Sequence, residues 1–185
     1  MTRIIAGAAG GRRLKVPASG VRPTGDRARE GLFNSLGSLL DLEGTRVLDL
    51  YAGSGALGLE ALSRGASDVV FVENGPRVLP VLRGNIATVG MPGAHVLPSS
   101  VPTAVAKPSG GPPFDLVLAD PPYAVPADVV LTVLDGLVTH GWLAPEAVLV
   151  VERPAREDPW AWPTPLRGLR DRRYGEALLR YGRAA

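Results

Sequence analysis

The chain has 185 residues, of which 45% are hydrophobic and 21% charged, and its formal net charge is +2, a balance that predicts one globular domain with a full core. The absence of cysteine excludes disulfides, thiolate metal sites and a cysteine nucleophile, and the isolated His95 and His140 argue against a zinc site. No apolar run reaches the roughly 18 residues of a membrane span and no signal-peptide core is evident, so we expect a cytoplasmic protein with no metal and no membrane partner.

The first predicted element is a β-hairpin within residues 3–17, where two short strands flank a glycine-rich turn at residues 7–11. A lone hairpin is marginal in water, so it must pack on the rest of the molecule or order on a partner. Cationic and apolar side chains alternate in its second strand, which places the cations on one face. We therefore expect an N-terminal hairpin arm over residues 1–22 and the main domain over residues 23–185.

A helix is predicted next, within residues 21–40, because apolar residues recur there at helical spacing. Thr24 or Asp26 is the expected N-cap, since either side chain can accept from a free backbone N–H. Arg27 and Arg29 would lie in the first turn, where the helix dipole disfavours cations. Their placement therefore favours contact with an anionic partner over stabilisation of the helix.

The most informative stretch is residues 47–58, an apolar strand that passes through a loop of small residues into a helix. Gly53, Gly55 and Gly58 match the spacing G-x-G-x-x-G, typical of nucleotide-binding units whose glycines let the backbone approach a ligand. Asp49, near the strand end, would repel a pyrophosphate but could accept from a cationic amino group or a ribose hydroxyl. The loop thus favours a cationic nucleoside such as S-adenosylmethionine, although a turn that only packs would also need small residues.

The second strand of this unit is predicted at residues 68–72 and ends at Glu73, 24 residues after Asp49. An acid at this position hydrogen-bonds ribose hydroxyls in dinucleotide-binding folds. Alternatively, Glu73 could cap the next helix, predicted over about residues 76–89. Pro80 interrupts that helix, which must either start near it or kink there.

A weaker third strand is predicted at residues 94–98, followed by Ser99 and Ser100. By their position these serines should lie near the adenine of a bound nucleoside. The Pro- and Gly-rich residues 108–113 form a loop that is too short to link two domains.

A second chemical motif, Asp120-Pro-Pro-Tyr123, follows the buried strand predicted at residues 114–119 and lies at the sheet edge where open α/β sheets bind ligands. The Asp120 carboxylate and the Pro121 carbonyl could accept from an exocyclic base amine and stabilise the charge that develops as its nitrogen attacks. The prolines fix the backbone, and Tyr123 offers a flat face to an extruded base. Asp-Pro-Pro could also be a plain turn.

The remaining elements complete a sheet. They are a helix over residues 126–138, a fifth strand over 146–152, and two late strands over 165–172 and 176–182 that suit an antiparallel edge. Three tryptophans are expected to fill the core or cover an edge: Trp142, Trp160 and Trp162.

Charge is segregated along the chain. Residues 1–30 hold seven basic groups against two acidic ones, residues 31–152 five against twelve, and residues 153–185 eight against four. If both ends lie on one side of a cleft, they give it a basic rim suited to a polyanion; ordinary solvated charge would produce the same counts. Arginine supplies 18 of the 20 basic residues, and its forked side chain suits phosphates.

Several of these motifs resemble one family. Residues 49–58 resemble the cofactor loop of class I S-adenosylmethionine methyltransferases, and residues 120–123 resemble their amino-methylating signature. Residues 3–7, 12–14, 22–34 and 173–176 are similar to the bacterial methyltransferases that modify a guanine N2 in 16S ribosomal RNA. The resemblance implies a Rossmann-like α/β fold, with a seven-stranded, mostly parallel sheet, an antiparallel C-terminal edge hairpin and the N-terminal arm. It also implies S-adenosylmethionine as cofactor and 16S rRNA of the small subunit as substrate.

The resemblance also implies individual roles. Expected cofactor contacts are Asp49, Tyr51, Gly53, Gly55, Leu57, Glu73, Asn74, Ser99 and Ser100. The catalytic residues that hold the guanine would be Asp120, Pro121, Pro122 and Tyr123. Expected RNA contacts are Arg12, Arg13, Lys15, Arg22, Thr24, Arg27, Arg29 and Tyr174. The family often has an acid after the third strand, whereas this chain has Ser99 and Ser100 there. A serine hydroxyl or a backbone group would therefore contact the adenine amine.

The expected enzyme is a monomer that needs no metal, because a sulfonium methyl group is already activated. Three alternatives remain open. A DNA adenine-N6 or cytosine-N4 methyltransferase could use the same tetrad, but such enzymes generally carry a larger target-recognition insert. An NAD-dependent oxidoreductase is disfavoured by Asp49 and by the lack of an evident catalytic histidine or Tyr-x-x-x-Lys pair. A non-catalytic RNA-binding protein would have no need of all four residues 120–123.

Overall fold

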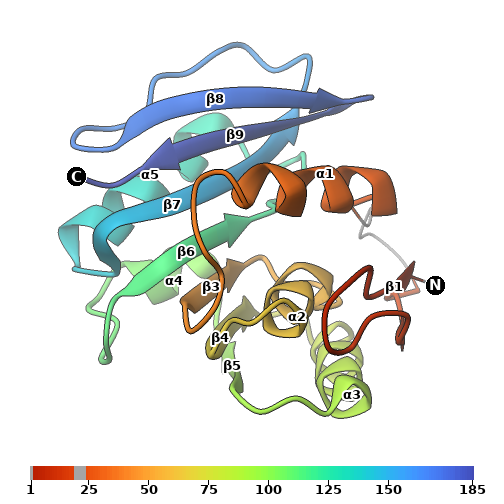
Figure 1. The fold of residues 1–185 in the computed structure, drawn as a ribbon. Coiled ribbons are helices and arrows are strands. Elements are labelled where there is room, and N and C mark those ends of the chain that lie inside the picture. Colours follow the sequence, from red (N-terminus) through yellow and green to blue (C-terminus); the bar gives the residue numbers. More distant parts are fainter. Residues whose placement is uncertain (1, 19–23) are drawn as a thin grey trace.

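A computed structural model describes residues 2–18 and 24–185, in which five helices and a seven-stranded sheet form three layers (Figure 1). The expected RNA contact Arg22 lies outside the described residues. In chain order the elements are β1 (Thr2–Arg3), β2 (Arg13–Leu14), α1 (Asp26–Leu36), β3 (Arg46–Leu50), α2 (Ala56–Ser63), β4 (Asp68–Glu73), α3 (Leu79–Val89), β5 (Ala94–Pro98), α4 (Val101–Val105), β6 (Phe114–Ala119), α5 (Ala127–Thr139), β7 (Leu143–Pro154), β8 (Arg167–Tyr174) and β9 (Ala177–Arg183).

The large sheet has the strand order β5-β4-β3-β6-β7-β9-β8. Strands β3 to β7 are parallel, whereas β9 and β8 run antiparallel at one edge. The expected mostly parallel sheet with an antiparallel C-terminal hairpin is therefore confirmed. The chain order reverses direction between β3 and β6, and open α/β sheets bind ligands at such a switch point, outside the carboxyl ends of the strands.

Helices cover both faces of the sheet, which explains why the central strands are continuous apolar runs. Along β3, Val47 belongs to the core that α1, α2 and α3 cover, and Leu48 belongs to the core under α4 and α5. Both side chains are fully buried, and each buried aliphatic side chain stabilises the fold by roughly 1.5–3 kcal/mol. In the residues that the structure describes, no helix is both long and apolar enough to cross a bilayer.

The N-terminal hairpin lies against α2 and α3 (Figure 1), as its marginal intrinsic stability requires. The backbone N–H groups of Ile5 and Ala6 donate to the buried Glu60 carboxylate at 2.8 and 3.1 Å. Gly7 has φ +83°, and a Cβ there would lie 1.9 Å from the backbone oxygen of Ser63. Only glycine therefore allows the turn to approach α2 this closely.

Several element boundaries differ from those predicted. Helix α1 begins at Asp26 with Gly25 as its N-cap and no capping side chain, so the expected cap by Thr24 or Asp26 is wrong. Helix α3 begins at Leu79 with Pro80 in its first turn, where proline is tolerated without a kink. Strand β7 starts earlier and ends later than predicted.

The five-residue helix α4 was not predicted at all. Ser100 caps it by accepting from the N–H of Thr103. The tryptophans fill the core and cover its edge as expected. Trp142 is buried and stacks on Phe114, and Trp160 and Trp162 pack partly buried against the same core.

Candidate active site

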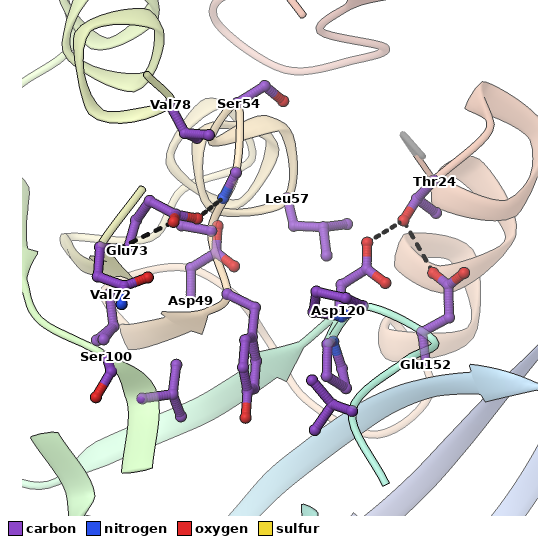
Figure 2. Close-up of a pocket in the computed structure, with 18 of the residues that line it drawn as sticks. Thr24, Asp49, Ser54, Leu57, Val72, Glu73, Val78, Ser100, Asp120 and Glu152 are labelled. Atoms are coloured by element: carbon purple, nitrogen blue, oxygen red, sulfur yellow. Dashed lines mark hydrogen bonds between the residues drawn. The ribbon is translucent and has the colours of Figure 1, made fainter. Parts of the chain in front are cut away.

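A cavity of about 490 Å³ opens at the carboxyl ends of β3, β4, β6 and β7 (Figure 2). Its volume lies in the range of small-molecule sites. All the expected catalytic and cofactor residues except Gly55 line this cavity, together with Thr24 and Glu152. Its walls carry four carboxylates and, among the described residues, no lysine, arginine or histidine.

The loop between β3 and α2 forms one wall. Tyr51 is not a glycine yet has φ +58°, and Gly53 and Gly55 have φ +56° and +85°. A large residue in the left-handed region costs about 1–3 kcal/mol and occurs mostly at functional sites. The Tyr51 hydroxyl is buried and finds no hydrogen-bond partner among the described residues. Asp49, 1% exposed, accepts from the N–H of Gly58 at 3.0 Å and so ties the strand to the first turns of α2.

Burial raises the pKa of Asp49 well above its ordinary value, opposed by the Gly58 N–H and assisted by the negative charges of Asp120 and Glu73. A bound cation would offset this cost, because it favours the ionised carboxylate. The loop is thus built around a carboxylate that a cationic ligand would stabilise.

Glu73 is held by the backbone of two loops. One carboxylate oxygen accepts from the N–H of Gly53 at 2.9 Å, and the other accepts from the N–H groups of Asn74 and Gly75, each at 2.9 Å. Because α3 has Val78 as its N-cap, the alternative in which Glu73 caps that helix is wrong. The oxygen that accepts from two N–H groups has both lone pairs in use, whereas the oxygen that accepts from Gly53 keeps acceptor capacity for a ligand hydroxyl.

Ser99 and Ser100 also line the cavity, but their hydroxyl hydrogens are used inside the protein. Ser99 donates to the backbone oxygen of Ser100 at 2.9 Å, and Ser100 donates to the hydroxyl of Thr103 at 2.7 Å. Toward a ligand these serines can therefore act as acceptors, which is what an adenine amine requires.

The Asp-Pro-Pro-Tyr segment leads into a turn over residues 122–125, in which the Val125 N–H donates to the Pro122 oxygen at 2.9 Å. The segment is more than a connection, because all four residues from Asp120 to Tyr123 line the cavity. The buried Arg153 donates to the Val125 oxygen at 2.7 Å and also binds Glu157, so it anchors the segment from the neighbouring strand β7.

Asp120 lies in a pair of carboxylates joined by one hydroxyl. The Thr24 hydroxyl is 2.8 Å from an oxygen of Asp120 and 2.9 Å from an oxygen of Glu152 (Figure 2). Glu152 is 8% exposed, and its other oxygen lies 3.4 Å from the Tyr123 hydroxyl. Burial, and then the neighbouring charge of Glu152, raise the pKa of Asp120 to about 8, while the Thr24 hydrogen bond lowers it.

Glu152 was missed as a candidate site residue. The run Leu-Val-Val-Glu152 repeats the pattern of Val-Phe-Val-Glu73, an apolar parallel strand that reaches an acid. The same argument that singled out Glu73 therefore applied to Glu152. Thr24, expected to contact RNA, lies inside the cavity beside these carboxylates.

The other expected RNA contacts are divided between surface and core. The side chains of Arg12, Arg13, Lys15 and Arg27 are exposed, although Arg12 also donates to the backbone oxygen of Val89. Tyr174 is half-buried against α1, where a Cβ at Gly31 would lie 2.2 Å from its hydroxyl.

The expectation that Arg29 contacts RNA is wrong. Its side chain is 0% exposed and donates to Thr2 and to the backbone oxygen of Arg3, and it pairs with Asp26 at 3.1 Å and Glu60 at 3.8 Å. Burial lowers the pKa of Arg29, and both carboxylates oppose that effect. The cation in the first turn of α1 therefore joins the hairpin to the domain.

Comparison with known proteins confirms the family that the motifs indicated. The model of the family described as "Conserved hypothetical protein 95" matches residues 2–183. The chain is 42% identical over 151 residues to ribosomal RNA small subunit methyltransferase D of Escherichia coli K12, which covers 81% of this chain and 73% of that protein. The protein of that name from Haemophilus influenzae is 40% identical over 153 residues, covering 81% and 77%.

Solved structures of methyltransferases have the same fold as this chain. The Escherichia coli protein yhhF, described as a methyltransferase, superposes with a TM-score of 0.86 at 36% identity, covering 98% of this chain and 97% of that one. The Haemophilus influenzae methylase HI0767 gives a TM-score of 0.80 at 32% identity, with the same coverage. The chain therefore belongs to the conserved hypothetical protein 95 family, alongside the methyltransferase D proteins that it resembles.

Proposed function

We propose that this protein transfers a methyl group from S-adenosylmethionine to the exocyclic N2 amine of one guanine in 16S ribosomal RNA. The observation that carries the proposal is the composition of the cavity. A glycine-rich loop and the Asp-Pro-Pro-Tyr segment face each other across it, and the charged groups among its described lining residues are four carboxylates. Such walls suit a cationic nucleoside on one side and an amine on the other.

The residues present fit this cofactor. The buried Asp49 carboxylate and the unpaired Tyr51 hydroxyl are available to polar groups of the ligand, and Glu73 can accept from ribose hydroxyls. Leu57, Val78 and Val101 supply apolar walls for the base. Asn74, Ser99 and Ser100 line the same cavity and offer polar groups to the cofactor.

The bound cofactor would supply an activated methyl group on a sulfonium. The chain's own residues would prepare the attacking nitrogen, whose lone pair is otherwise conjugated with the base. Asp120 would accept one N2–H and the Pro121 carbonyl the other, which stabilises the positive charge as the nitrogen–methyl bond forms and the sulfur–methyl bond breaks. Asp120 would then take the surplus proton, and Tyr123 would hold the base by stacking.

The RNA substrate is supported by the names of the relatives and by the hairpin. Exposed Arg13 and Lys15 lie on the arm beside α3, and Asn85 of α3 bonds both the Lys15 backbone and Ser54 in the cavity wall. The arm is thus placed close to the cofactor loop, where its cations could bind phosphates. So small an arm cannot distinguish much sequence, so we expect the folded shape of the substrate to select the site.

The rival functions find less support. An NAD-dependent enzyme would bring a pyrophosphate beside Asp49 and Glu73, with no basic residue among the described lining to balance it. A non-catalytic RNA-binding protein would gain nothing from the Asp120–Glu152 pair, because placing two acids side by side out of water destabilises the fold. Such costly pairs cluster at active sites.

Methyl transfer from labelled S-adenosylmethionine tests the proposal, with small ribosomal subunits, protein-free 16S RNA and duplex DNA assayed in parallel. Nucleoside analysis should find N2-methylguanosine only with the ribosomal substrates. Label in DNA adenine or cytosine would overturn the substrate, and no label on any substrate would overturn the enzymatic function.

A further inference from the structure

The part of the site that the motifs do not explain is Glu152. It belongs to β7, outside the Asp-Pro-Pro-Tyr turn, yet it lines the same cavity and is 8% exposed. Thr24 lies within hydrogen-bond distance of both Glu152 and Asp120. A threonine hydroxyl has only one hydrogen, so it can donate to only one of the two carboxylates at a time. The pair therefore has more acceptor oxygens than the Thr24 hydroxyl can satisfy.

Two adjacent carboxylates make a pattern of acceptors that distinguishes the four bases. The Watson–Crick edge of guanine presents two neighbouring donors, the N2 amine and the N1–H. Adenine and cytosine present an amine beside a ring nitrogen that accepts, and uracil has no amine. Enzymes that act on extruded bases recognise them through hydrogen bonds to this edge. Guanine alone would satisfy both carboxylates.

We propose that Glu152 accepts from the N1–H of the target base while Asp120 accepts from its N2 amine, so that the pair selects guanine. The inference rests on the proposed methyl transfer and adds the residue that sets base identity. Thr24 is then a positioning residue, since its hydroxyl lies within hydrogen-bond distance of both carboxylates and can donate to either.

The pair also predicts a pH dependence. An acid that carries a proton cannot accept at that oxygen, so the pair must be ionised to bind both donors. Two titratable groups lie against the pair besides its own members: the Asp49 carboxylate, which the charge of Asp120 affects, and the Tyr123 hydroxyl, 3.4 Å from Glu152. Arg153 follows Glu152 in β7, but its guanidinium binds Val125 and Glu157. Because burial and Glu152 both raise the pKa of Asp120, kcat/KM should rise with pH. In Glu152→Gln the rise should occur at lower pH, because the neighbouring negative charge is gone.

The first experiment compares Glu152→Gln with Glu146→Gln, an exposed acid at the other end of β7. Glu152→Gln should bind S-adenosylmethionine as the wild type does but lose about 10-fold in kcat/KM for the ribosomal substrate, the effect of a charged hydrogen-bond acceptor. Glu146→Gln should retain wild-type values. Unchanged kcat/KM and pH profile in Glu152→Gln would overturn the inference.

The second experiment changes the base. In a semisynthetic 16S RNA, the guanine that the wild type methylates is replaced by 2-aminopurine, which keeps the amine but has an acceptor at N1. The wild type should methylate it far more slowly than guanine. The amide of Glu152→Gln can donate to that acceptor, so the variant should lose much of the preference for guanine. Equal rates for the two bases in the wild type, or an unchanged preference in the variant, would contradict the role of Glu152.

These outcomes are separate from a failure of the proposed function. If the wild type transferred no methyl group to guanine N2 in unmodified RNA, the proposed reaction itself would be wrong. If it did so with no discrimination against 2-aminopurine, the reaction would stand and only the role of Glu152 would fall.

Discussion

The carboxylates at the two ends of the cavity differ in the hydrogen-bond donors that hold them. On the side of the glycine loop, Asp49 and Glu73 accept from backbone N–H groups at 2.9–3.0 Å. On the other side, Asp120 and Glu152 share one threonine hydroxyl (Figure 2). Backbone donors hold the first two acids in the loop, whereas side-chain hydroxyls hold the second two. In the proposed function the first pair would bind the cofactor and the second pair would act on the substrate base.

The largest effect is expected from Asp120→Ala. Loss of the acceptor for the amine should reduce kcat by about 10²–10⁴-fold, the usual contribution of a general base. Binding of S-adenosylmethionine should persist, because Asp120 lies across the cavity from the glycine loop that we propose as the cofactor site (Figure 2). Single-turnover methyl transfer and calorimetric titration of the cofactor measure the two quantities. Full activity at normal cofactor affinity would remove the distinction between the two ends.

The opposite pattern is expected from Glu73→Gln. A neutral amide accepts more weakly from the N–H groups of Gly53, Asn74 and Gly75, so the variant should bind S-adenosylmethionine about 10-fold more weakly and lose about 1–2 kcal/mol of unfolding free energy. Saturating cofactor should restore kcat. The exposed Glu43→Gln is the matched control for titration and urea unfolding. A loss of kcat that cofactor cannot restore would assign Glu73 to the reaction.

A smaller effect separates stability from activity. Folding raises the pKa of Asp120 from 3.8 to about 8. Between these pH values the folded protein holds a proton that the unfolded chain has released. The contribution of Asp120 to the free energy of unfolding therefore falls as the pH rises from about 4 to about 8. Asp120→Asn should therefore unfold less readily than the wild type, by on the order of 1 kcal/mol. The gain should be absent near pH 4 and greatest above pH 8, as urea unfolding at several pH values can measure. If Asp120→Asn were less stable than the wild type at pH 8, the ionised Asp120 carboxylate would not destabilise the fold, and the prediction would be wrong.

Features that depend on neighbouring residues in the sequence could be predicted, whereas features that depend on contacts between distant segments could not. The sequence indicates Asp49, Glu73 and Asp120 because each lies at or next to the carboxyl end of an apolar parallel strand, which is a local pattern. Glu152 carries the same pattern but was overlooked, and its partnership with Thr24 joins residues 128 positions apart.

The place of Arg29 in the first turn of a helix predicts contact with an anionic partner, and the structure buries the side chain instead. Its burial depends on Glu60 of α2 and on the hairpin, neither of which lies on that helix. Helix α4 was missed because five residues with a proline give too short a periodic pattern. Local patterns thus predicted the strands and loops, while packing between distant segments decided which charges reach the solvent.

The smallest effect concerns the arm, which lies outside both carboxylate pairs. Arg13→Ala and Lys15→Ala remove exposed cations near the cofactor loop, so each should raise KM for the ribosomal substrate a few-fold, more at low salt than at high salt, and leave kcat and cofactor affinity unchanged. The control is Lys107→Ala, which removes an exposed cation outside the cavity lining. The backbone oxygen of Lys107 accepts from the Trp142 indole. Equal effects of Lys107→Ala and Lys15→Ala would mean that general charge, and not the arm, attracts the RNA. A change in kcat would instead mean that the arm helps to position the base between Asp120 and Glu152.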